Sequence, residues 1–172
     1  MQVIPFIVPE DPLKSSSLSQ LDERRRLSIM VEYLFGQGVA SALPKEGLRV
    51  VYSKRSGRVK LVYHHERLFA TVKPGGAMAL SIHGAELLAK SHKFRESCIT
   101  VADGTAEFVR GGRSVFCKFV VSAGANVTPR GEVAILDTHG VVLGVGTAVM
   151  NGRFMKQFKS GAAVKIRTGR GP

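Results

Sequence analysis

Two spacings of hydrophobic residues alternate along the chain and predict both helices and strands. Apolar side chains recur every three or four residues between Leu27 and Phe35, which predicts a helix over residues 21–35. The spacing then changes to two, and runs rich in Val, Tyr, Phe and Thr over 49–53, 59–63 and 68–72 predict a meander of three strands. A second helix is expected over 81–89. Residues 1–20, with three prolines and a run of serines, predict an extended lead-in.

The second half of the chain uses shorter elements. The pattern predicts short helices after Asp103 and over 153–159, and strands over 99–101, 114–121, 132–136, 141–150 and 162–167. Polar residues gather at 92–96 between apolar segments, so we place a domain boundary there. The predicted fold is α+β. A small α/β-meander module at 21–93 precedes a mostly antiparallel pseudo-barrel with two short helices at 96–169.

The charge of the chain indicates a polyanionic partner. There are 25 Lys and Arg residues against 13 Asp and Glu residues, a formal net charge of +12. Residues 1–95 hold 15 basic and 8 acidic groups (+7), and residues 96–172 hold 10 and 5 (+5), so neither half is a basic tail on a neutral body. Such an excess favours nucleic acid as the partner. A basic protein without such a partner is the alternative.

The cysteines and the apolar segments indicate an intracellular protein. Cys98 and Cys117 lie in apolar runs, where free thiols behave as small buried hydrophobic groups in a reducing cytoplasm. The first residues lack a basic region, and prolines interrupt their apolar run, which is not typical of a signal peptide. The apolar stretch 141–150 is well short of the ~20 residues that a membrane-spanning helix needs. We expect a cytoplasmic protein.

Motifs for metal, nucleotide and catalytic chemistry are missing from the sequence. The five histidines show no metal-binding spacing, the cysteines form no C-x-x-C pair, and no P-loop occurs. Gly144-Val145-Gly146 begins like a dinucleotide-binding fingerprint, but Val149 stands where the third glycine should be. The few carboxylates are scattered. We therefore expect no metal, no cofactor and no enzymatic activity, with an enzyme acting on RNA through residues distant in sequence as a remaining alternative.

Several motifs of the second half occur together in a familiar order. They are D-G-T-A-E-F-V at 103–109, G-G-R-S-V-F at 111–116, G-E-V-A at 131–134, V-G-T-A at 145–148 and G-A-A-V-K at 161–165. In order, spacing and glycine placement, they resemble a PUA domain over residues 97–169. Three motifs of the first half, Y-L-F-G-Q-G at 33–38, S-K-R-S-G-R at 53–58 and L-F-A-T-V-K-P at 68–74, resemble the module before the PUA domain in archaeal tRNA-guanine transglycosylases, the enzymes of archaeosine formation.

The likeness covers residues 24–169 and only the C-terminal, non-catalytic part of those enzymes. Nothing in this sequence corresponds to the family's catalytic barrel, with its aspartates and its zinc held by cysteines and a histidine. In PUA domains, the turn between the first helix and the second strand faces RNA together with the last strand. The resemblance therefore implies RNA contacts at Gly111, Gly112, Arg113, Lys118, Lys165 and Arg167, with Arg110 beside them.

The residue types at this turn suit phosphate binding. Glycines let a backbone approach phosphates closely and can leave amide groups free, and Arg offers a planar fork or a stacking surface. The alternative for Gly111-Gly112 is plain helix termination. A second basic stretch contains Lys54, Arg55 and Arg58, and it either contacts an RNA backbone or forms a solvated hairpin edge.

These observations predict a non-catalytic RNA-binding protein. It would hold tRNA or another structured RNA through phosphates and shape, and position that RNA for modification or translation. The alternative is a protein-interaction subunit of a split tRNA-guanine transglycosylase that does not bind RNA by itself. The expected partners are structured RNA and, in the second interpretation, a tRNA-modifying enzyme subunit.

Overall fold

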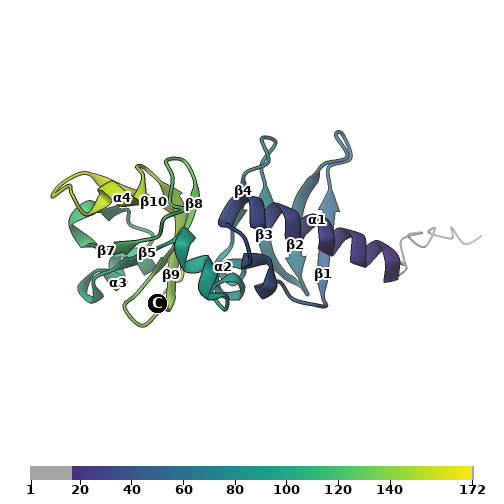
Figure 1. The fold of residues 1–172 in the computed structure, drawn as a ribbon, viewed down its shortest axis with the longest axis horizontal. Coiled ribbons are helices and arrows are strands. Elements are labelled where there is room, and N and C mark those ends of the chain that lie inside the picture. Colours follow the sequence, from purple (N-terminus) through teal and green to yellow (C-terminus); the bar gives the residue numbers. More distant parts are fainter. Residues whose placement is uncertain (1–16, 172) are drawn as a thin grey trace, which may run out of the picture.

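The computed structural model describes residues 17–171, and for residues 17–20 it describes the backbone alone. Figure 1 shows two sheet-containing modules side by side along the long axis of the molecule. The first module contains α1 (Ser17–Phe35), the 3-10 helix η1 (Val39–Ala42), β1 (Leu48–Tyr52), β2 (Val59–His64), β3 (Arg67–Val72), β4 (Met78–Leu80) and α2 (Ile82–Leu88). The second contains η2 (His92–Ser97), β5 (Cys98–Val101), η3 (Asp103–Thr105), α3 (Ala106–Arg110), β6 (Val115–Phe116), η4 (Cys117–Phe119), β7 (Val120–Ala123), β8 (Glu132–Leu136), β9 (Val142–Ala148), α4 (Gly152–Met155) and β10 (Ala162–Gly169). The predicted α+β class is confirmed.

The first module is a four-stranded antiparallel meander covered by α1. Its strands follow the order β1-β2-β3-β4, and α1 runs across one face of the sheet (Figure 1). Leu27, Val31 and Phe35, spaced by four residues, form the buried stripe of this helix. The helix begins at Ser17, so residues 17–20 are not part of an extended lead-in, and residues 1–16 of that prediction lie outside the described residues. Strand β4 has three residues, too few for an alternation of apolar and polar side chains to be recognised in the sequence.

A single glycine allows α2 to lie against the sheet. A Cβ atom at Gly84 would lie 2.1 Å from the backbone oxygen of Phe69 in β3, closer than any side chain permits. The helix begins at an N-cap formed by Ser81, whose hydroxyl accepts a hydrogen bond from the backbone N–H of Gly84 at 3.0 Å. Close approach and capping together fix the position of α2 on β3.

The second module is a nearly closed pseudo-barrel with one six-stranded sheet. The strand order is β6-β10-β9-β8-β5-β7, and β5 with β8 is its one parallel pair. The predicted strand over 114–121 is wrong in its middle, because Cys117–Phe119 forms a 3-10 turn between β6 and β7. Cys117 is buried, as expected of a free thiol in an apolar run, and the turn leaves Lys118 exposed. The short helix expected after Asp103 is present as η3 followed by α3, and the Asp103 carboxylate accepts from the Thr138 hydroxyl instead of capping that helix.

The two modules share one apolar core. Phe94 in η2, fully buried at the expected domain boundary, packs with Phe35 of α1 at a ring distance of 5.4 Å. The Ser97 hydroxyl and the Asn126 amide donate hydrogen bonds to the backbone oxygen of Phe35 at 2.9 and 3.2 Å, and so cap the end of α1 from the second module. The shared core continues into the pseudo-barrel through Cys98, Ala134, Leu136, Val142 and Val145.

The pseudo-barrel also has an interior core of its own, which includes Ile99, Ile135 and Leu143. Among residues 17–171, no helix combines the length and apolarity required to cross a bilayer.

Candidate nucleic-acid interface

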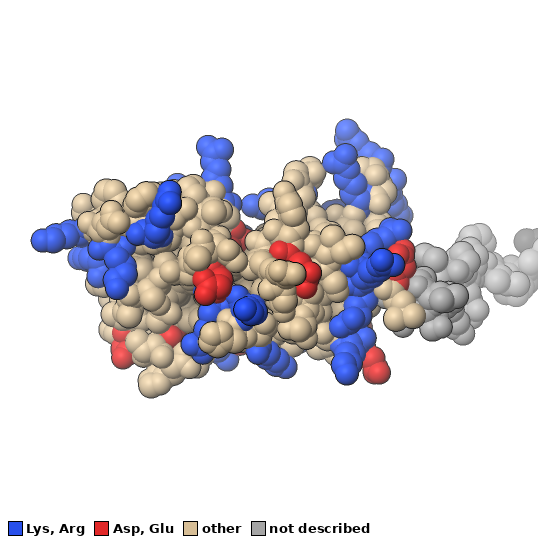
Figure 2. Space-filling view, in the orientation of Figure 1, with Lys and Arg blue, Asp and Glu red and all other residues tan. Residues whose placement is uncertain are grey.

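Strand direction places several loops at one end of both sheets. The strand pairings place the β1–β2 and β3–β4 connections at one end of the first sheet, and the β7–β8 and β9–β10 connections at one end of the second. Figure 1 shows both ends on the upper side of the molecule. These four connections, residues 53–58, 73–77, 124–131 and 149–161, contain no Asp or Glu. Their cations define a surface that we call the basic edge: Lys54, Arg55, Arg58, Lys73, Arg130, Arg153, Lys156 and Lys159. Figure 2 shows Lys and Arg side chains projecting along this upper side of the molecule.

One contact joins two loops of the basic edge in the first module, and a charge effect extends from there to the second module. The Arg58 guanidinium donates to the backbone oxygen of Pro74 at 3.2 Å, which joins the β1–β2 and β3–β4 connections. Lys73 lies close enough to Glu132, at the start of β8, for its charge to lower the pKa of that carboxyl. The edge therefore continues from the meander to the pseudo-barrel.

Glu132 belongs to an ion-paired clamp between the modules. Its carboxylate accepts from the Leu80 backbone N–H at 2.9 Å and from the Arg167 Nη1 atom at 2.7 Å. Arg167 Nη2 donates to the Leu80 backbone oxygen at 2.6 Å. Burial raises the pKa of Glu132, although the bonds to Arg167 lower it, and burial is the larger effect. We call this set the Glu132–Arg167 clamp.

The clamp changes the interpretation of Arg167. The sequence predicted an RNA contact there, but the guanidinium is bound in two directions by Glu132 and Leu80. An Arg that holds a carboxylate through both nitrogens has few donors left for phosphate. Arg167 therefore joins the modules, and we leave it out of the basic edge.

The glycine turn after α3 lies at the other end of the pseudo-barrel and has no free amides. The Gly112 N–H bonds to the Val109 oxygen and the Arg113 N–H to the Phe108 oxygen, both at 2.9 Å, with Gly112 at φ +80°. This is the Schellman pattern of a helix end. The expectation that these glycines present amides to phosphate is wrong, because α3 carbonyls already accept those N–H groups.

Charges of both signs lie at this end of the molecule, where Lys45, Arg67 and Arg170 accompany the acidic residues. The chain segments there include Glu46, Glu66, Asp103, Glu107 and Asp137. Arg110 packs beside the last strand, since the Gly171 N–H bonds to its backbone oxygen at 3.1 Å. Arg113 is exposed, with its guanidinium 5.5 Å from the Phe108 ring. RNA contact by Arg110, Gly111, Gly112 and Arg113 stays a prediction, and it does not depend on free amide groups in this turn.

The other predicted residues lie on or beside the basic edge. Lys54, Arg55 and Arg58 form its first-module end. Lys165 is exposed on β10 and pairs in register with Thr147, which in turn pairs with Glu132. Lys118 follows Cys117, whose N–H bonds to the Gly161 oxygen at 2.9 Å, where the β9–β10 connection ends. The structure thus brings five predicted residues together and separates them from the α3 turn.

Sequence reasoning missed five cations of this edge. Lys73, Arg130, Arg153, Lys156 and Lys159 are isolated or loosely spaced along the chain. The available signal was the lack of acidic residues in each of their loops. Their common location depends on strand direction, including the parallel β5–β8 pair, which no local pattern reveals.

Exposed aromatic rings adjoin the pseudo-barrel end of the edge. Phe154 and Phe158 are 39% and 52% exposed, and the Arg153 guanidinium lies 4.6 Å from the Phe154 ring centre. Phe116 in β6 is 48% exposed and pairs in register with Ala162, next to the same loop. Rings and cations in this arrangement suit stacking with unpaired bases.

Comparison with known proteins identifies both modules. Residues 98–170 match the PUA domain model, and residues 25–94 match the model described as patch-forming domain C2 of tRNA-guanine transglycosylase. The chain therefore carries a C2 patch-forming domain followed by a PUA domain. The resemblance noted in the sequence is confirmed.

The relatives of the chain are archaeal tRNA-guanine(15) transglycosylases. That of Thermoplasma volcanium is 30% identical over 164 residues, which are 95% of this chain and 25% of the relative. That of Thermococcus onnurineus is 33% identical over 147 residues, 85% of this chain and 25% of the relative. The chain thus spans about a quarter of the length of these relatives, and its homology is with their C-terminal regions.

Solved structures share the fold at low identity. A hypothetical protein from Pyrococcus horikoshii has a TM-score of 0.67 at 18% identity, with 86% of this chain and 90% of that chain covered. A conserved PUA domain protein from Thermoplasma acidophilum has a TM-score of 0.57 at 19% identity, with 89% and 91% covered. Both likenesses extend over the two modules and concern the fold alone.

Proposed function

We propose that this protein binds structured RNA, tRNA first, along the basic edge and positions it for a tRNA-modifying or translation reaction. The observation that carries the proposal is the gathering of eight cations, without a carboxylate among them, in four loops at one end of both modules. The PUA domain and the tRNA-guanine transglycosylase relatives support RNA as the polyanion. Localisation in the cytoplasm, where such RNA occurs, belongs to the same proposal.

The arrangement suits recognition of shape and phosphate. A row of Lys and Arg side chains neutralises successive phosphates and releases their counterions, which makes binding strongly dependent on salt. The Glu132–Arg167 clamp and the shared core hold the two ends of the row in a fixed relation. A fixed row favours a rigid RNA helix over a flexible chain. The exposed Phe154 and Phe158 rings would stack with unpaired bases next to that helix.

Equilibrium binding of total tRNA and of a DNA duplex of the same length, across a salt series, tests this proposal. The variant Lys54→Ala/Arg55→Ala/Arg58→Ala is expected to weaken tRNA binding about tenfold or more, and to make the log Kd–log salt slope shallower by about two to three units. The variant Arg153→Ala/Lys156→Ala/Lys159→Ala should behave in the same way.

A matched control removes the same charge elsewhere. Arg25, Lys45 and Lys90 are exposed and lie outside the basic edge, so their joint replacement by alanine should leave the slope within about half a unit of the wild type. If the control and the edge variants weaken binding equally, the protein attracts RNA by net charge alone. If Arg110→Ala/Arg113→Ala abolishes binding and the edge variants do not, the α3 turn is the interface.

A second candidate function rests on the exposed side of α1. Leu21, Ile29 and Tyr33 are 64%, 62% and 88% exposed on this helix, and Ile29 and Tyr33 are one turn apart, a spacing at which exposed apolar side chains can meet a partner protein. This favours a subunit that docks on a tRNA-modifying enzyme, with the basic surface incidental. Co-purification that is lost in Ile29→Ser/Tyr33→Ser, together with no retention of RNA, would support this function over the first.

A further inference from the structure

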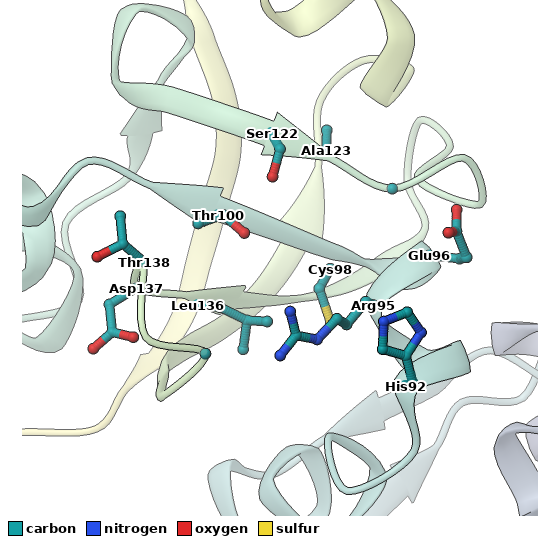
Figure 3. A pocket seen from close by; sticks show the side chains of 12 residues that line it. His92, Arg95, Glu96, Cys98, Thr100, Ser122, Ala123, Leu136, Asp137 and Thr138 are labelled. Carbon is teal, nitrogen blue, oxygen red and sulfur yellow. The ribbon is translucent and has the colours of Figure 1, made fainter.

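An open pocket of about 320 Å³ lies on the outer side of the pseudo-barrel, between η2 and the β8–β9 turn (Figure 3). It contains none of the cations of the basic edge and reaches the other end of β8, although Gly124 at the start of the β7–β8 connection also lines it. Its lining residues are His92, Arg95, Glu96, Cys98, Thr100, Ser122, Ala123, Gly124, Leu136, Asp137, Thr138 and Gly140.

Strand alternation forms the floor of this pocket. Ser122, Thr100 and Leu136 are register partners on the neighbouring strands β7, β5 and β8, and so they form one row across the sheet. Their neighbours Ile99 and Ile135 point into the barrel core. Leu136 also belongs to the core shared with the first module, so the pocket begins where that module no longer covers the outer face of the sheet.

The walls bring charged and polar groups over this floor. Figure 3 shows the Arg95 guanidinium directed into the pocket beside His92, with Asp137 and Thr138 on the opposite side. Arg95 lies near enough to Cys98 for its charge to lower the pKa of the thiol, although burial still raises that pKa to about 12. A Cβ atom at Gly140 would lie 3.3 Å from the Arg95 Nη2 atom, so the guanidinium lies beside the β8–β9 turn that lines the pocket.

Donors and acceptors in the pocket are available for a ligand. Among the described residues, the Arg95 guanidinium and the Thr100 and Ser122 hydroxyls have no hydrogen-bond partner. Asp137 Oδ1 accepts from the backbone N–H groups of His139 and Val141 at 2.9 and 2.8 Å, which leaves Oδ2 for another donor. The site thus offers a planar cation, two hydroxyls and a carboxylate oxygen.

We propose that this pocket binds a nucleobase, either of a free nucleoside or of an unpaired nucleotide in RNA. A base presents ring acceptors and amino or imino donors in one plane, which matches a mixture of hydroxyls, guanidinium and carboxylate, and guanidinium groups stack on bases. A volume of about 320 Å³ is in the range of small-ligand pockets. A bare phosphate matches less well, since the carboxylates of Glu96 and Asp137 also line the site.

The first experiment titrates the full chain with guanosine, adenosine, cytidine, uridine and inorganic phosphate, and follows backbone amide NMR shifts. The amides of Gly124 and Gly140, which line the pocket, should shift with at least one nucleoside. Arg95→Ala and Thr100→Val should each weaken that binding at least about tenfold. Thr100→Val keeps the side-chain volume and removes only the hydroxyl. Arg25→Ala, an exposed arginine on α1, should change nothing.

The second experiment presents the base in RNA. A hairpin with an unpaired 2-aminopurine should change its fluorescence on binding, and Arg95→Ala and Thr100→Val should each reduce that change at least about tenfold. An effect of both variants in either experiment supports the pocket and identifies the source of the base. The proposal is overturned if phosphate alone shifts the pocket amides, or if neither variant alters binding in either experiment. The nucleoside titration does not depend on the proposed RNA function, so the two can fail separately.

Discussion

The Glu132–Arg167 clamp makes a quantitative prediction about stability. The Glu132 side chain is 9% exposed and the Arg167 side chain 34% exposed. Removing one partner of a fully buried ion pair costs about 3–5 kcal/mol, because the other charge remains buried and unpaired. Since Arg167 is partly solvated, we expect Arg167→Ala to lower the free energy of unfolding by about 2–3 kcal/mol at pH 7. For a chain of this size, that corresponds to a Tm decrease of about 4–12 °C.

The loss of unfolding free energy caused by Arg167→Ala should depend on pH in a defined direction. Burial raises the pKa of Glu132 even in the wild type, so the buried carboxylate opposes folding above that pKa, and its protonated form does not. Arg167→Ala removes a group that lowers this pKa, and the pKa of Glu132 should rise further. The destabilisation by Arg167→Ala is therefore largest at neutral pH, and it shrinks as the pH falls and Glu132 becomes protonated.

Urea unfolding at pH 7 and pH 4 measures both effects. Glu132→Gln keeps the shape and the acceptor for the Leu80 N–H without the charge, so Arg167→Ala in the Glu132→Gln background should cost about 1 kcal/mol or less. The reasoning is refuted if Arg167→Ala unfolds within about 0.5 kcal/mol of the wild type at pH 7, or if its cost is the same at both pH values and in both backgrounds.

Three further predictions concern other parts of the fold. Gly84→Ala should lower the free energy of unfolding by more than about 2 kcal/mol in urea unfolding, since its Cβ atom would meet the Phe69 oxygen at 2.1 Å, whereas Gly104→Ala, with open space around it, should cost less than about 1 kcal/mol. Cys98, whose pKa is raised to about 12, should react with a thiol reagent at pH 8 only after unfolding, and rapid labelling of the native protein would contradict its burial. Burial lowers the pKa of His64 and of His83, whose Nδ1 and Nε2 atoms lie 3.0 Å apart, so stability should fall as the pH drops below their ordinary pKa. Thermal unfolding of His64→Gln/His83→Gln between pH 7 and pH 5 should show a smaller fall than the wild type.

Much of the fold could be predicted from local patterns. The four-residue stripe of α1 and the alternation in β1 to β3 belong to elements long enough to show their period. The 3-10 turn at Cys117–Phe119 could not be predicted, because its residues continue the apolar pattern of a strand, and the chain changes its pairing partner there from β10 to β5. Elements of three residues, such as β4, carry too little pattern to be recognised.

The candidate site was harder to predict than the fold. The basic stretch at 54–58 was visible because its cations are adjacent in sequence. Lys73 and Arg130 join it only through strand pairing, which the sequence does not express locally. The pairing of Arg167 could not be predicted, because an exposed strand cation and an interface cation look alike until a partner 35 residues away, Glu132, is located.

The most direct test of the basic edge maps tRNA onto the protein by amide NMR shifts or hydrogen exchange. We predict that the largest changes fall within residues 53–58, 73–77, 124–131 and 149–161, in both modules at once, and that residues 43–47 and 65–66 at the opposite end remain unchanged. Changes confined to α3 and the Gly111-Gly112 turn, or no changes in the four basic loops, would contradict the account.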